Sequence, residues 1–231
     1  LSEKPMTWKP ILGIALLSLA VPSLGQIIPN DAQEPVEVNK ARGEFARKLH
    51  GQVMPKGKGW KPVMDLDRKL QIMLPEKWKA TVTRDAEAAI VAVPGGDKEP
   101  TAQFRLSILA PRDADPFDID EEFALKYADD LKDDPQFRKL KYQPTDSGHV
   151  LMRGMKFALA GGTLTVDSEV PGKGKRQKVS ETFQQEQLVY IAFDRLVVMQ
   201  FTAPAKDFPR YAADVARIFA SYQNLGVPKI D

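Results

Sequence analysis

The sequence predicts an α+β domain, an α/β/α sandwich in which a central antiparallel sheet of about seven strands lies between helical layers. Apolar and polar residues alternate in short successive segments from 66 to 201, as in strands that bury one face. These segments follow one another without intervening helices, which requires antiparallel hairpins. Two other segments have the spacing of amphipathic helices, and these helices can cover the two faces of the sheet.

The first half of the domain contains four predicted strands. Apolar residues recur at every second position in 70–74, and Pro75 ends that strand. The Pro-Gly-Gly-Asp sequence at 94–97 predicts a turn that closes the third strand. The other three strands are predicted at 78–82, 88–93 and 104–110.

Two helices are predicted, one after these strands and one near the end of the chain. The first covers 118–130, where Asp118 can act as the N-cap and Glu121 has the spacing of a capping box. The second covers 208–222, with Pro209 in its first turn. The first helix is expected to bury a stripe spaced four residues apart, namely Phe123, Tyr127 and Leu131.

The second half of the domain is richer in strands. One strand is predicted at 150–157, and the pair Gly161-Gly162 predicts a turn before another strand at 164–168. The sequence at 171–176, Pro-Gly-Lys-Gly-Lys-Arg, predicts the basic tip of a hairpin. The remaining predicted strands are 179–183, 188–193 and 196–201.

Residues 6–25 have the pattern of a secretory signal peptide. Lys9 precedes an apolar run at 11–21, and Pro22 and the small residues of Ser23-Leu24-Gly25 follow. A membrane-spanning helix needs about 20 apolar residues, so this run is too short to cross a bilayer. We therefore predict that 1–25 are removed, whether translation starts at Leu1 or at Met6. The mature protein is then exported, to the periplasm or to the medium.

The mature chain is predicted to consist of an arm followed by one domain. Residues 26–65 are rich in proline and glycine and form the arm, in which 39–50 can form a short helix. The domain covers 66–226, where the alternating segments and the helices lie, and 227–231 form a C-terminal tail.

Composition restricts the class of function. The chain has 33 basic and 31 acidic side chains and a net charge of +2, which gives no support for nucleic-acid binding. It has no cysteine, which excludes disulfides, thiolate metal sites and lipid attachment to a cysteine. No stable membrane anchor is therefore expected after cleavage.

The sequence predicts no catalytic, metal-binding or cofactor-binding residues. The two histidines, His50 and His149, are far apart, and no hydrolase, zinc-protease or phosphate-loop motif occurs. The alternative is a small-ligand carrier or a hydrolase-type enzyme whose site is assembled only in three dimensions. Tyr142, His149 and Arg153 are the candidates for such a site.

Five residues are candidates for contact with a partner. Four lie at the basic hairpin tip and suit an anionic surface, although charges at a hairpin tip also serve solubility alone. The fifth is a tryptophan in the arm. The candidates are Lys173, Lys175, Arg176, Lys178 and Trp60.

Several segments resemble the PsbP-like family. The sequence at 74–78, Leu-Pro-Glu-Lys-Trp, resembles its strand-Pro-x-x-Trp start, and the helix at 118–130 resembles its first helix. Residues 197–204 and 208–222 resemble its last strand and closing helix. The resemblance implies an α/β/α sandwich that binds proteins and generally has no enzymatic activity. The resulting hypothesis is an exported, non-enzymatic adaptor whose partner is another envelope or secreted protein.

Overall fold

The computed structural model describes residues 34–84, 88–96, 101–109, 126–127, 129–171, 176–192 and 195–225. The predicted signal peptide at 1–25 and the tail at 227–231 lie outside these residues. Most of the helix predicted at 118–130 also lies outside them. Within it, Lys126, Tyr127, Asp129 and Asp130 are described, and all four are helical.

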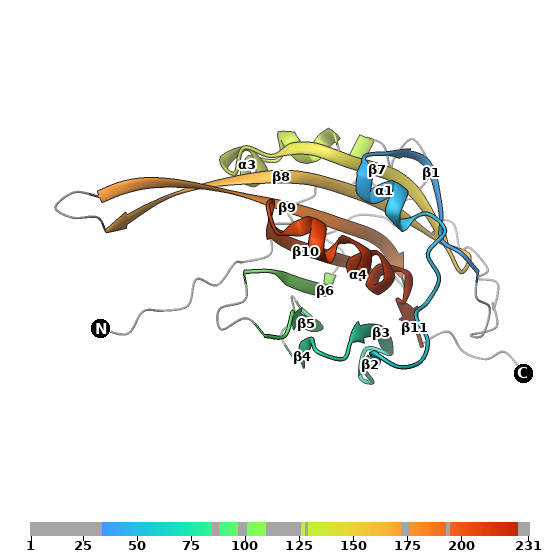
Figure 1. Ribbon diagram of the computed structural model, residues 1–231. Helices are drawn as coiled ribbons and strands as arrows, with labels where there is room; N and C mark the ends of the chain where they lie inside the picture. Colours follow the sequence, from blue (N-terminus) through green and yellow to red (C-terminus); the bar gives the residue numbers. More distant parts are fainter. Residues whose placement is uncertain are drawn as a thin grey trace, which may run out of the picture.

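The described chain forms one large and one small antiparallel sheet (Figure 1). The large sheet has eight strands, one more than predicted, in the order β1 (Glu37–Arg42), β7 (Gln143–Met152), β8 (Met155–Pro171), β9 (Arg176–Ala192), β10 (Arg195–Pro204), β6 (Gln103–Leu109), β5 (Ile90–Val93) and β4 (Lys79–Val82). The small sheet has three strands, in the order β11 (Gln223–Asn224), β3 (Leu70–Pro75) and β2 (Trp60–Asp65). The predicted α+β class and antiparallel sheet are confirmed.

Helices cover both faces of the large sheet, as the sandwich requires. One face packs against α1 (Glu44–Leu49), α4 (Phe208–Ala220) and the small sheet. The opposite face packs against the 3-10 helix η1 (Leu131–Asp133) and α3 (Pro135–Lys139). Alternation along β8 serves both cores, since Phe157 and Leu159 enter the first core whereas Ala158 and Ala160 enter the second.

The segment predicted as an arm contributes β1, α1 and β2, so the boundary expected between 65 and 66 does not match the described elements. β1 pairs with β7, with Val38 opposite Val150, and Phe45 and Leu49 of α1 are buried. Pro62 fits within β2 because β2 is an edge strand, where a missing N–H breaks no ladder. The proline and glycine content misled the prediction, because a few buried apolar residues suffice to attach the segment to the sheet.

The turn predicted at Gly161-Gly162 is wrong. The hairpin turn lies earlier, at Arg153 and Gly154, which have φ angles of 50° and 70°. Two consecutive positive φ angles are typical of the type I′ turn that joins antiparallel strands. Apolar residues lie directly on both sides of this turn, at Met152 and Met155, so the sequence does not mark it. β8 then continues through both glycines, and β9 joins two segments that were predicted as separate strands.

We expect Phe45→Ala to reduce the free energy of unfolding by about 3–5 kcal/mol, the usual cost of emptying a buried aromatic site. The Phe45 ring lies 6.0 Å from the Phe208 ring and 5.6 Å from the Phe219 ring, centroid to centroid. Urea unfolding measures the effect. Leu66→Ala is the control, because Leu66 is 74% exposed, and it should change stability by less than about 0.5 kcal/mol. Equal effects of the two substitutions would contradict the attachment of α1 to the core.

Candidate interaction surface

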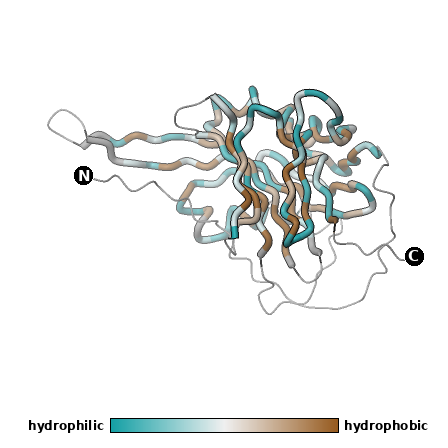
Figure 2. Tube along the Cα trace, turned by 90° about the horizontal axis from the view of Figure 1, so that it is seen from below, coloured by the Kyte–Doolittle hydropathy of each residue, from teal (hydrophilic) through white to brown (hydrophobic). Residues whose placement is uncertain are grey.

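The hairpin of β8 and β9 extends beyond the rest of the large sheet as a two-stranded ribbon (Figures 1 and 2). Towards the tip of the hairpin, the outermost residue of β8 that pairs with β7 is Thr163, opposite Gln143. The outermost residue of β9 that pairs with β10 is Phe183, opposite Pro204. We call 166–171 of β8 and 176–181 of β9 the outer ribbon. Within it the two strands pair only with each other, through to Pro171 opposite Arg176.

Of the five predicted contact residues, the structure describes Arg176, Lys178 and Trp60. Lys173 and Lys175 lie outside the described residues. Arg176 is the first residue of β9, and Lys178 is exposed, opposite Glu169 in the strand register. Trp60 begins β2 in the small sheet and packs, partly buried, on the first core. In Figure 1 the small sheet and the end of the ribbon lie on opposite sides of the molecule.

Two hydrogen bonds at the base of the outer ribbon show which way its peptide groups point. The Thr165 N–H donates to the Leu140 carbonyl at 2.7 Å, and the Ala205 N–H donates to the Thr182 carbonyl at 2.8 Å. Peptide groups point to the same edge at every second residue of a strand. Asp167 and Glu169 therefore direct their peptide groups to the outer edge of β8. Arg176, Lys178 and Ser180 direct theirs to the outer edge of β9.

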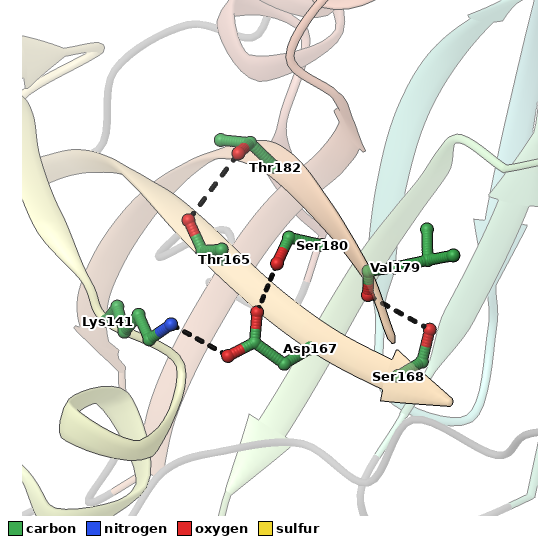
Figure 3. A network of polar contacts seen from close by, with 7 residues as sticks. All are labelled: Lys141, Thr165, Asp167, Ser168, Val179, Ser180 and Thr182. Carbon is green, nitrogen blue, oxygen red and sulfur yellow. Dashed lines mark hydrogen bonds and ion pairs between the residues drawn. The ribbon is translucent and has the colours of Figure 1, made fainter. Parts of the chain in front are cut away.

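The two outer edges differ in how accessible they are to another strand. On β8, Lys141 Nζ lies 2.7 Å from Asp167 Oδ2 (Figure 3). Pro171, at the end of β8, has no N–H to donate. The hydrogen bonds from Lys141 and Ser180 lower the pKa of Asp167, so this carboxylate stays charged beside the edge. Charged side chains and proline are the devices that usually block edge strands. Beyond Thr182, the outer edge of β9 pairs with no described strand.

Polar contacts across the strand pair hold the base of the ribbon, where Val166 also packs on the second core. The hydroxyl oxygens of Thr165 and Thr182 are 3.5 Å apart, and Ser180 Oγ donates to Asp167 (Figure 3). Ser168 Oγ donates to the Val179 carbonyl at 3.4 Å. Two-stranded ribbons of this kind are only marginally stable in water. The pairing of the two strands with each other therefore contributes little to the stability of the outer ribbon.

The candidates for an enzyme or carrier site do not converge. The Tyr142 hydroxyl donates to the Gly161 carbonyl at 2.9 Å. Arg153 lies beyond the opposite end of β7 and donates to the Tyr222 and Ala220 carbonyls, at the C-terminal end of α4. β7 has ten residues, so about 33 Å of strand separates its two ends. His149 lies within β7 and is bonded by neither residue.

Sequence reasoning missed a buried pair of acidic residues. Asp146, Gly161 and Glu186 lie opposite one another in a row across β7, β8 and β9. Both acids are buried, and a Cβ on Gly161 would lie only 2.0 Å from Glu186 Oε2. On the other face, a Cβ on Gly162 would lie 2.1 Å from Tyr142 Cε2. The glycine pair, mistaken for a turn, provides space for these side chains and was the sequence signal for them.

The acidic pair also attaches α1 to the sheet. The Ala46 N–H, in the first turn of α1, donates to Asp146 Oδ1 at 2.9 Å. Gly43 precedes α1 with φ at 91°, and a Cβ there would lie 2.1 Å from the same oxygen. Burial raises the pKa of Asp146, although the Ala46 N–H opposes that rise. Burial, followed by the charge of Asp146, raises the pKa of Glu186 well above its usual range.

Two classes of site are not found in the described part of the chain. No group of three or more histidine, cysteine, aspartate or glutamate side chains is placed there to hold a metal ion. None of its helices combines the length and the apolar character needed to cross a bilayer.

No family model and no curated protein matches the chain. Solved structures do match, including a PsbP protein, as the sequence resemblance implied. PsbP of the cyanobacterium Synechocystis is 8% identical, with a TM-score of 0.48 over 73% of this chain and 94% of that one. LpqN, involved in cell envelope biogenesis of Mycobacterium tuberculosis, is 16% identical, with a TM-score of 0.41 over 71% and 89%. The Ran-binding protein Mog1p of Saccharomyces cerevisiae is 14% identical, with a TM-score of 0.43 over 72% and 95%. At these identities and scores, neither function nor partner follows from the likeness.

We expect Gly161→Ala to lower the free energy of unfolding by about 1–3 kcal/mol, because the added methyl group overlaps the Glu186 carboxyl group. The cost should fall by about 1 kcal/mol or more in a Glu186→Ala background, where that group is absent. Urea unfolding of the four variants completes the cycle. An equal cost in both backgrounds would mean that Gly161 does not serve the acidic pair.

Proposed function

We propose that this protein is a non-enzymatic adaptor that binds another protein through the outer ribbon. The observation that carries the proposal is that the ribbon extends past both neighbouring strands, with the outer edge of β9 unpaired beyond Thr182. Strand addition to an exposed sheet edge is a common way of binding an extended segment of a partner. The peptide groups of Arg176, Lys178 and Ser180 supply the edge for it.

The charge pattern favours a different protein over a second copy as the occupant of this edge. In an antiparallel pair of two β9 edges centred on Lys178, that residue would face its own copy. Like charges directly opposite each other destabilise strand pairing. An acidic side chain at that position of the partner would instead be attracted to the exposed Lys178. The occupant we propose is therefore an extended segment with an acidic residue opposite Lys178.

We also propose that the protein meets this partner outside the cytoplasm. The support is the signal-like sequence at 6–25, whose apolar run is too short for a membrane span. In this proposal 1–25 are removed during export. The remaining chain then binds an envelope or secreted protein, without a cofactor.

Replacing 169–178 by Asn-Gly should abolish partner binding and leave the domain folded. The deletion keeps the pairing of Ser168 with Val179 and removes the pairs beyond it, from Glu169 opposite Lys178 to Pro171 opposite Arg176. A two-residue Asn-Gly loop suits the type I′ turn of such a hairpin. Affinity capture from the native envelope fraction measures binding, and circular dichroism with thermal unfolding checks the fold.

The matched control is Leu66→Ala, an exposed change away from the ribbon that should leave capture intact. Lys178→Glu should weaken capture without shortening the ribbon. Recovery of the same partner in equal yield by the shortened variant would refute the proposed surface.

A further inference from the structure

The attachment of α1 to the large sheet depends on the carboxyl groups of Asp146 and Glu186, which lie side by side. No basic side chain of the described residues is among the groups that shift the pKa of either acid. Glu186 is fully buried, and the residues that act on it are Asp146 and Gln184, whose Nε2 donates to Glu186 Oε1 at 2.9 Å. Asp146 holds α1 through the Ala46 N–H. We infer that protonated Glu186 allows the Asp146 carboxylate to hold α1, and that ionisation of Glu186 detaches α1 from the sheet and from α4.

The physical cause is repulsion between like charges at low effective dielectric. A charged Glu186 beside a charged Asp146 would place two negative charges over Gly161, in a site that water does not reach. The raised pKa of Glu186 has the corresponding sign, because a buried acid with a raised pKa stabilises the fold at low pH. This stabilisation is lost as the pH rises through the folded-state pKa.

Charged groups on the surrounding elements do not relieve this repulsion. On α1, Glu44 pairs with Lys48, and Arg47 is exposed. On β1, Lys40 and Arg42 are exposed, and on α4 so are Arg210 and Arg217, while Asp214 is half-buried and negative. On the opposite face, the Tyr142 hydroxyl bonds the Gly161 carbonyl, and its pKa is raised chiefly by burial and then by Glu186.

α1 is suited to separate before the rest of the domain unfolds. It has six residues, too few for a helix that is stable without tertiary contacts. Phe45 packs on Phe208 and Phe219, so detachment would uncover an apolar surface on α4. Local opening of a weakly held segment costs less than global unfolding. The acidic pair would thus make an apolar surface accessible as the pH rises, independently of the outer ribbon.

Hydrogen exchange of the full chain over a pH series tests this inference. Exchange is corrected for its intrinsic pH dependence and compared between α1 and α4. In the unmodified protein, protection of the Ala46 amide should fall by up to about tenfold per pH unit between the ordinary pKa of an exposed glutamate and the raised folded-state pKa of Glu186, and it should level off above that pKa. Binding of the dye ANS should rise over the same range. α4 should keep its protection.

Two variants decide the cause. Glu186→Gln keeps the shape and the hydrogen-bonding capacity but cannot ionise, so α1 protection should keep only the pH dependence that comes from Asp146. Asp146→Asn removes the other charge, and α1 protection should then be weaker at every pH but flatter. An unchanged pH response in Glu186→Gln would overturn the inference. So would simultaneous loss of protection in α1 and α4, because that pattern is global unfolding.

Discussion

The uninterrupted pairing of β8 with β9 is the constraint on which the rest of the structure depends. Each strand has 17 residues, more than any neighbour in the sheet, so the pair continues where β7 and β10 have ended. At one end it forms the centre of the eight-stranded sheet between two apolar cores. At the other end it forms the outer ribbon, with a partly blocked edge on β8 and an open edge on β9.

Polar side chains are buried where β9 crosses the middle of the large sheet, namely Gln185, Glu186 and Gln187. Each of them has a different environment. Gln185 accepts hydrogen bonds from Gln200 and Thr202, and Glu186 occupies the space above Gly161. Buried polar groups are costly unless they are paired. The two glycines in β8 would ordinarily weaken a strand, yet here they admit a carboxyl group on one face and a phenol ring on the other. The polar row is accommodated only in part, because Glu186 Oε2 and the side-chain amide of Gln187 are buried without a hydrogen-bond partner.

The row of Asp146, Gly161 and Glu186 connects the two ends of the described chain. β1 and α1 are the first elements of that chain, and α4 is its last helix. Asp146 fixes the start of α1, and the Phe45 ring then reaches Phe208 and Phe219. Arg153, in the turn between β7 and β8, donates to the carbonyls that end α4. Long-range contacts of this kind make the N-terminal segment part of the domain.

The sequence by itself determined the α+β class, the antiparallel sheet and most of its strands. Alternation of apolar and polar residues follows from burial of a strand face, which neighbouring residues are sufficient to reveal. Strands at 70–75, 90–93 and 103–109 and the helix at 208–220 were predictable for that reason.

Only the tertiary structure decided how β1 and α1 join the sheet, that Gly161-Gly162 lies within a strand, and that Asp146 meets Glu186. It also decided that the ribbon extends past its neighbours and that the small sheet, which contains Trp60, lies on the opposite side of the molecule from the end of the ribbon. Each of these features depends on residues distant in the sequence that the register of pairing brings together. A register shift of one residue would exchange the two faces of a strand, so these contacts depend on where the turn at Arg153-Gly154 lies. Local patterns do not contain that information.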